Sequence, residues 1–144
     1  MKFKYNFLSL FLFFIITFFV SCSPDEEDEP APTVDPKLRF VADWTCSEVS
    51  RRDQPAQPFQ IHLLNGSGDT VIMENCYAVG FNKKAKLVVS GDNIRFDPQD
   101  QQITTGVFLK SGQGSLINSN TIKMTYIIDD GNTIMDTVDA TFTK

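Results

Sequence analysis

The sequence predicts an all-β protein, an eight-stranded antiparallel up-and-down (meander) barrel that begins with a short helical turn. Two observations carry this prediction. Apolar and polar residues alternate with a period of two in almost every segment after residue 44, and turn-forming residues recur at short intervals. No segment after residue 44 has sustained helical periodicity. A flat sheet of eight strands would leave two open edges, so closure into a barrel is favoured, and a two-sheet sandwich is the alternative.

The predicted domain covers residues 36–144, which is enough chain for one domain and too little for two. Asp35-Pro36 predicts a capped helical turn over residues 36–42, because aspartate is a common N-cap and proline suits the first helical position. We expect the eight strands over residues 44–50, 59–64, 70–79, 85–89, 93–96, 108–117, 121–128 and 134–142.

Small and polar residues separate these strands. The turns are expected at residues 65–68, 90–92, 118–120 and 129–132. The Ser90-Gly91-Asp92 segment and the Asp129-Asp130-Gly131-Asn132 segment are strong hairpin signals, because glycine, asparagine and aspartate readily adopt the backbone angles that tight turns need. Each strand is therefore expected to pair with the next one along the chain.

Residues 1–21 have the organisation of a secretory leader. Lys2 and Lys4 precede an apolar run over residues 7–20, which at 14 residues is shorter than the roughly 20 that span a bilayer. Phe19-Val20-Ser21-Cys22 resembles a bacterial lipobox. The resemblance implies a lipoprotein signal peptide, cleavage before Cys22 and lipidation of that cysteine, so that the lipid joins the protein to a membrane. An uncleaved anchor helix is the alternative.

Residues 22–35 are expected to form a disordered tether. Five consecutive acidic residues, Asp25 to Glu29, repel one another, and nearby prolines keep the chain extended. An acidic cluster just after a lipidated cysteine resembles the export signal of Bacteroidota surface lipoproteins. That resemblance implies an outer-membrane protein facing the cell exterior. The periplasmic face is the alternative, since acidic spacers also serve solubility.

The charge distribution separates tether from domain. Without Lys2 and Lys4 the chain has 11 basic and 18 acidic residues, whereas residues 36–144 hold all 11 of these basic residues and 12 acidic ones. The domain is thus close to neutral. No basic patch interleaved with aromatic residues is apparent, which argues against nucleic-acid binding.

Catalytic chemistry is not indicated by the sequence. His62 is the lone histidine, on the strand face opposite Ile61 and Leu63, and no spacing typical of a metal site accompanies it. No nucleophile motif is present, so we expect no enzymatic activity and no cofactor. Glu48 has the same parity as Trp44 and is the carboxylate most able to face inward. Cys46 and Cys76 fall on the first and third predicted strands, too far apart for a disulfide, and are expected to be buried thiols.

Several segments resemble a known family. Residues 41–45, Val41-Ala42-Asp43-Trp44-Thr45, following a helical turn, are similar to the Gly-x-Trp opening of lipocalin-like (calycin) barrels. The segments at residues 75–81, 111–114, 129–131 and 137–142 resemble small Bacteroidota lipoproteins assigned to that superfamily. This resemblance implies that Trp44 closes the barrel floor, with its indole N–H bonded to a backbone carbonyl.

The function expected from these observations is non-enzymatic binding of a small apolar molecule in the barrel. The candidate binding residues share the inner face of the predicted strands: Trp44, Ile61, Leu63, Leu87, Phe96, Met124, Tyr126 and Phe142. An eight-stranded barrel either holds one small ligand or is filled by its own side chains. The alternative is therefore a filled barrel that acts as a protein- or glycan-interaction module at the cell surface.

Overall fold

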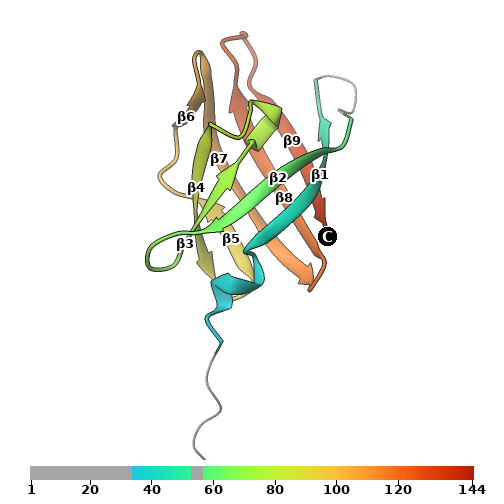
Figure 1. Cartoon of the computed structure of the whole chain (residues 1–144). Coiled ribbons are helices and arrows are strands. Elements are labelled where there is room, and N and C mark those ends of the chain that lie inside the picture. Colours follow the sequence, from blue (N-terminus) through green and yellow to red (C-terminus); the bar gives the residue numbers. More distant parts are fainter. Residues whose placement is uncertain (1–33, 53–56) are drawn as a thin grey trace, which may run out of the picture. The chain divides into compact units, whose positions relative to one another are not determined.

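The computed structural model describes residues 34–52 and 57–144. Its strands form one antiparallel sheet that curls into a barrel (Figure 1). In chain order the elements are η1 (Pro36–Arg39), β1 (Ala42–Ser50), β2 (Phe59–Asn65), β3 (Thr70–Glu74), η2 (Cys76–Ala78), β4 (Lys84–Ser90), β5 (Asn93–Phe96), β6 (Gln101–Thr104), β7 (Val107–Asn118), β8 (Thr121–Asp129) and β9 (Asp136–Thr143).

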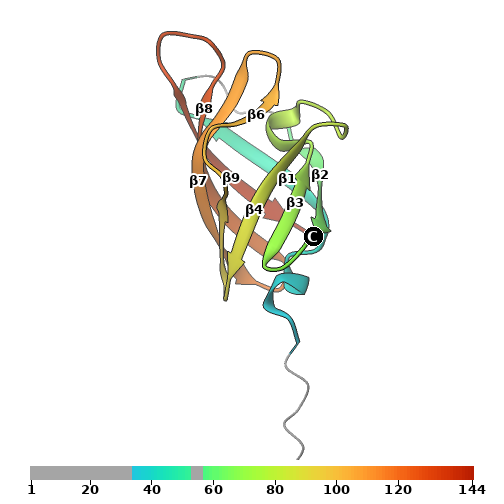
Figure 2. The same ribbon diagram turned by 90° about the vertical axis from the view of Figure 1, so that its left-hand side faces the viewer.

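The barrel closes where β5 pairs with β7. The strand order is β5-β4-β3-β2-β1-β9-β8-β7-β6, and residues 93–95 of β5 also pair with residues 113–115 of β7. Both β5 and β6 lie along the same edge of β7, one after the other, so they share one position in the wall (Figure 2). The wall is therefore an eight-stranded closed antiparallel meander, which confirms the predicted fold class.

Strand β6 is absent from the prediction because it lacks apolar alternation. Only Ile103 of its four residues is buried. A side chain continues the ladder between β4 and this part of the wall: Gln101 accepts from the Lys86 N–H (2.6 Å) and donates to the Lys86 carbonyl (2.8 Å). The Gln101 side chain thus makes the two hydrogen bonds to β4 that the backbone of a neighbouring strand would normally make. Alternation of apolar and polar residues in the sequence cannot predict such a contact.

Four predicted boundaries are wrong by two residues or more. The helical turn ends at Arg39, and β1 already begins at Ala42. The third strand ends at Glu74, because Asn75 adopts a left-handed conformation (φ 63°) and the chain enters η2. The last strand begins at Asp136, two residues later than expected. Residues 134 and 135 instead belong to the β8–β9 loop, and both side chains are at least half exposed.

The segment η1 closes one end of the barrel, the lower end in Figure 1. The Asp35 carboxylate accepts from the Lys37 N–H, which is the predicted N-cap. Phe40, directly after η1, is fully buried. The Lys37 ammonium donates to the carbonyls of Gly66 (3.1 Å) and Gly68 (2.6 Å) in the β2–β3 turn. The loops after β6 and β8, and η2, lie at the opposite end (Figure 1).

Trp44 forms the floor above η1. Its indole N–H donates to the Phe40 carbonyl at 2.8 Å, as the family resemblance implied. The Lys144 ammonium lies 4.3 Å from the centre of the indole ring, a cation–π contact between the two ends of the domain. Among the described residues, none of the helical segments has the length and apolar character needed to cross a membrane.

Candidate functional site

The barrel interior is occupied by side chains. All eight candidate binding residues point inward and are at most 3% exposed: Trp44, Ile61, Leu63, Leu87, Phe96, Met124, Tyr126 and Phe142. Phe96 and Tyr126 meet edge to face, with ring centroids 6.0 Å apart. These residues lie in one continuous core with Phe40, Val71, Ile94 and Ile122. The inward placement confirms the strand parity, and ligand binding by these residues stays a prediction.

Two glycines of β7 allow close packing, Gly112 against the aromatic pair and Gly114 against the neighbouring strand β8. A Cβ atom at Gly112 would lie 2.5 Å from the Tyr126 Cβ and 2.7 Å from the Phe96 ring. At Gly114 it would lie 2.9 Å from the Met124 Cα. Large side chains from β5 and β8 thus occupy the space in front of β7, and the lumen is dense at this level.

A polar cluster lies inside the barrel toward the end opposite η1. Glu48 is 6% exposed and accepts a hydrogen bond from the Tyr126 hydroxyl. The Cys46 thiol lies 3.6 Å from the same carboxylate oxygen. Burial raises the pKa of Glu48, and the hydrogen bond from Tyr126 only partly offsets that effect. Glu48 therefore faces inward, as its parity predicted.

Asp136 joins the interior of the barrel at the first residue of β9. It is fully buried, and neither carboxylate oxygen has a hydrogen-bond partner. Its charge contributes to the raised pKa of Glu48. Sequence reasoning missed Asp136, although residue 136 lies within the predicted strand over residues 134–142. The alternation Asp136, Val138, Ala140, Phe142 would have identified it as an inward residue.

Cys46 and Cys76 are free and buried. β2 separates β1 from β3, in agreement with the predicted strand order, although Cys76 lies in η2 rather than on a strand. Burial raises the pKa of both thiols, so both are protonated and weakly nucleophilic at neutral pH. Residues 34–52 and 57–144 contain no group of three His, Cys, Asp or Glu side chains arranged to hold a metal ion.

His62 lies on the outer surface, as expected. Its ring stacks on Phe81 at a centroid distance of 4.5 Å, and Nδ1 lies 3.3 Å from the Glu74 carboxylate. The hydrogen bond from Lys84 lowers the pKa of Glu74, which keeps this surface group ionised. A second carboxylate, that of Asp43, lies 3.7 Å from Nε2, so the imidazole belongs to a surface cluster of charged and aromatic side chains.

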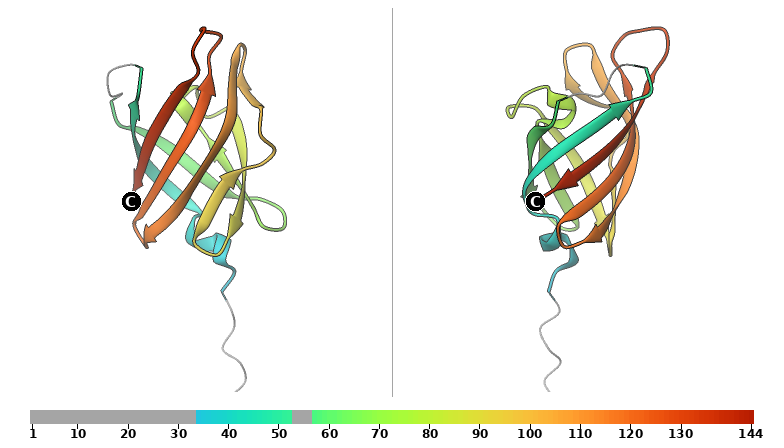
Figure 3. Two further views of the ribbon diagram at one scale, coloured as in Figure 1. Left: turned by 180° about the vertical axis from the view of Figure 1, so that it is seen from behind. Right: turned by 90° about the vertical axis from the view of Figure 1, so that its right-hand side faces the viewer.

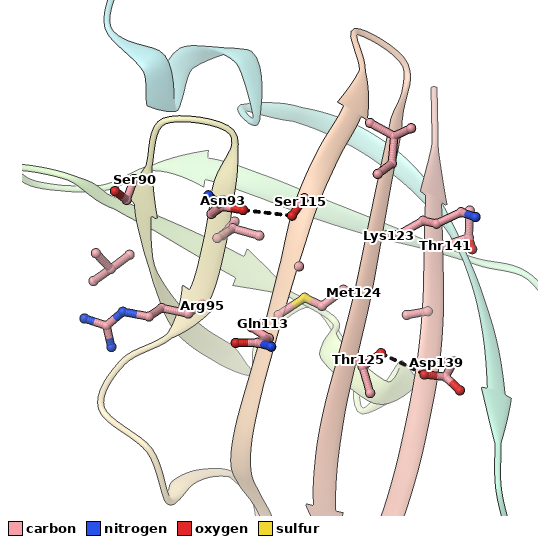
Figure 4. Close-up of a pocket in the computed structure, with 15 residues that line it drawn as sticks. Ser90, Asn93, Arg95, Gln113, Ser115, Lys123, Met124, Thr125, Asp139 and Thr141 are labelled. Carbon is pink, nitrogen blue, oxygen red and sulfur yellow. Dashed lines mark hydrogen bonds between the residues drawn. The ribbon is translucent and has the colours of Figure 1, made fainter.

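A hollow of about 670 Å³ lies on the outer surface of the wall formed by β5, β7, β8 and β9. Figure 3 (left) shows this wall from outside, and Figure 4 shows the side chains in close-up. Two hydrogen bonds order the surface: Ser115 to Asn93 (2.9 Å) and Thr125 to Asp139 (2.7 Å). The labelled lining residues are Ser90, Asn93, Arg95, Gln113, Ser115, Lys123, Met124, Thr125, Asp139 and Thr141.

Two further hollows extend the first one along β7. One, of about 430 Å³, shares Arg95, Gln113 and Thr125 with it and continues toward the end opposite η1. The other, of about 370 Å³, shares Ile117 and continues to η1. We call the three together the outer trough. It follows β7, where the outward residues Ser111, Gln113 and Ser115 are small or polar and Ile117 is aliphatic.

No sequence pattern pointed to the outer trough. Its residues come from η1, from the wall strands β4, β5, β7, β8 and β9, and from the connecting segments, and only folding brings them together. The one local signal is the run Ser111-Gly112-Gln113-Gly114-Ser115, which lacks a bulky side chain on either face of β7.

Comparison with known proteins agrees with the fold and goes no further. No protein-family model matches the chain, and no curated protein matches it. Among solved structures, the chain is similar to a redesigned β-barrel, with a TM-score of 0.56 over 78% of this chain and 96% of that chain, at 14% sequence identity. At so low an identity the likeness concerns the fold alone, and the fold is a closed antiparallel β-barrel.

Proposed function

We propose that this protein is a lipid-anchored, non-enzymatic lipoprotein of lipocalin-like type, in which a filled barrel acts as an interaction module. The observation that carries the proposal is the outer trough, an open hollow whose lining includes several polar and charged side chains, on a barrel whose interior is occupied by side chains. Specific ligand sites are usually concave and contain a few well-placed polar groups. On this molecule such groups gather outside the barrel.

The packed interior favours an interaction module over a small-molecule carrier. A carrier needs a lumen that water or ligand can enter, yet the aromatic residues at mid-height are almost fully buried by one another. Opening that space requires displacement of Phe96 or Tyr126, which are held against β7. The second candidate function, binding of a small apolar molecule, would therefore require a rearranged core.

The lipocalin-like assignment rests on the floor of the barrel. The Trp44 indole is bonded to the Phe40 carbonyl and covered by the Lys144 ammonium, with η1 below. This arrangement combines the tryptophan of the family's opening motif with a cation from the end of the last strand. It supports the assignment through particular contacts rather than through overall shape.

The proposed anchoring concerns residues 1–33, which lie outside the described part of the chain. Replacement of Cys22 by serine should abolish incorporation of labelled palmitate and leave the leader uncleaved. Label retained by the variant would contradict lipidation. If Asp25 to Glu29 direct the protein to the outer face, protease added to intact cells should degrade the natural protein and spare a variant with five alanines there. Equal protection of both would place the protein in the periplasm.

Position-specific photo-crosslinking tests the interaction module. A photoreactive amino acid replaces Gln113 in the outer trough or, as a matched control, Lys84 on the outer surface of β4. On intact cells we expect adducts from position 113 and none from position 84. Equal yields at both positions, or none at either, would contradict a trough-specific partner.

A fluorescent apolar probe tests the carrier function in parallel. We expect no saturable binding of the probe to the chain from residue 22 onward with Cys22 replaced by serine, because the lumen is filled. Saturable binding that also quenches Trp44 fluorescence would favour the carrier over the interaction module.

A further inference from the structure

We propose that the outer trough binds a linear anionic polysaccharide, one that carries carboxylate or sulfate groups along its length; this inference rests on the proposed interaction module. The first observation is charge segregation. Residues 36–144 are nearly neutral, with 11 basic and 12 acidic residues. Five of the basic residues but only two of the acidic ones, Asp92 and Asp139, line the trough. The five are Arg39, Arg51, Arg95, Lys123 and Lys144.

Three of the five cations are exposed and loosely held, and are therefore accessible to a ligand. Lys123 is exposed and has no ion-pair partner within the described residues. Arg95 is 59% exposed and 3.6 Å from Asp97, and Arg51 is 65% exposed and 3.5 Å from Asp139. Exposed pairs of this kind contribute about 0–1 kcal/mol. An incoming carboxylate or sulfate can therefore replace either aspartate at little cost.

The trough also has the shape of a binding site for a chain molecule. It runs along β7, whose 12 residues span about 40 Å. Cations occur near both ends: Arg39 of η1, which is paired with Asp92 at 2.6 Å, and Lys144, over the Trp44 ring, at one end, and Arg51 toward the other. Arg95 and Lys123 stand on opposite flanks of the central part (Figure 4). A chain ligand with anionic groups repeated along its length would therefore meet cations at both ends and in the central part of the trough.

Two features favour a polysaccharide over an acidic peptide. An extended peptide usually gains affinity by pairing its backbone with a free strand edge. β7 has no such edge along its length, since β8 pairs with one side and β5 and β6 with the other. The trough instead presents side-chain amides and hydroxyls, among them Gln113, Ser115 and Thr141, which can donate hydrogen bonds to sugar hydroxyls and accept hydrogen bonds from them.

Apolar anchors for a peptide are few in the central hollow, although Leu38 and Ile127 line the two outer hollows. Only Val88 and Ile117 among the outward residues of the central hollow are aliphatic, and they lie at different strands of the wall. Protein partners are usually held by aromatic or aliphatic side chains in a dry pocket. A hydrated, hydroxyl-rich chain has no such requirement.

The experiment is a calorimetric titration of the chain from residue 22 onward, with Cys22 replaced by serine. The probes are polygalacturonate, dextran sulfate, neutral dextran and a poly-glutamate peptide. We expect saturable binding of at least one of the two anionic polysaccharides, none of neutral dextran, and weakening as salt is added. The double variant Arg95→Gln/Lys123→Gln should bind roughly three- to tenfold more weakly, and the control Lys84→Gln should bind as the parent does.

Three results would overturn the proposal. These are absence of binding to both anionic polysaccharides, equal binding by the parent and the double variant, and binding of poly-glutamate as tight as that of the polysaccharide. The first would leave the interaction module standing if Gln113-specific crosslinks are found, because a partner of different chemistry would then occupy the trough. Absence of crosslinks specific to position 113 would instead contradict the proposed interaction module itself.

Discussion

Gly112 gives a direct test of how tightly the barrel interior is filled. Replacement by alanine adds one methyl group on the inner face of β7. That atom would lie 2.5 Å from the Tyr126 Cβ and 2.7 Å and 2.9 Å from two atoms of the Phe96 ring. The Tyr126 Cβ is fixed by the backbone of β8, which is hydrogen-bonded to β7 at this level. Rotation of a side chain cannot relieve the contact, so the strands must shift.

The expected loss of stability follows from two opposing effects. Extra volume in a packed core usually costs about 1–3 kcal/mol. The backbone of Gly112 is not in the left-handed region, so alanine also restricts the unfolded chain, which favours the fold by about 0.4–1 kcal/mol. The contacts of 2.5 Å and 2.7 Å place the first effect toward its upper range. We therefore expect a net loss of about 1–2 kcal/mol.

Thermal and urea unfolding would measure this loss. A domain of this size should melt roughly 4–8 °C lower for each kcal/mol. The control Gln113→Ala changes the neighbouring outward residue and should stay within about 0.5 kcal/mol of the parent. Shortening the Phe96 side chain to leucine should restore part of the loss in the double variant. Unchanged or raised stability in Gly112→Ala would refute a filled interior and favour an accessible lumen.

Three further predictions concern the buried polar groups. Burial raises the pKa of Glu48 above its ordinary value of 4.5, so the stabilising contribution of Glu48 is complete below that pH and is lost as the pH rises through the folded-state pKa. The melting temperature of Glu48→Gln relative to the unsubstituted protein should therefore increase from pH 4 to pH 8, and a constant difference would contradict this. Asp136→Asn removes an unpaired buried carboxylate and should raise the melting temperature at pH 7, whereas a lower value would reveal a favourable partner. Cys46 and Cys76 should both be alkylated when the Cys22→Ser chain is denatured without reductant, and a mass without two adducts would indicate a disulfide.

Local sequence patterns determined most of the architecture. Alternation with a period of two placed residues such as Ile61, Leu87 and Phe142 inside, because successive side chains of a strand point to opposite faces. The Ser90-Gly91-Asp92 turn and the Asp35 cap are also local, since backbone conformation and short-range hydrogen bonds fix them. The role of Trp44 followed from a resemblance whose motif is contained in a few adjacent residues.

Tertiary structure decided the features that depend on distant residues. Gln101 completes the ladder of β4, which no propensity of its own segment encodes. Asn75 ends β3 through hydrogen bonds to the Gln60 carbonyl and the Gly80 N–H, and only the first of these crosses to another strand. The outer trough combines β4 and β5 with β7, β8 and β9, strands that are separated in the sequence, so its concentration of basic residues cannot be read from a nearly neutral composition. The proposed binding surface forms only when closure of the sheet brings these side chains together, so their proximity in space cannot be inferred from their order in the sequence.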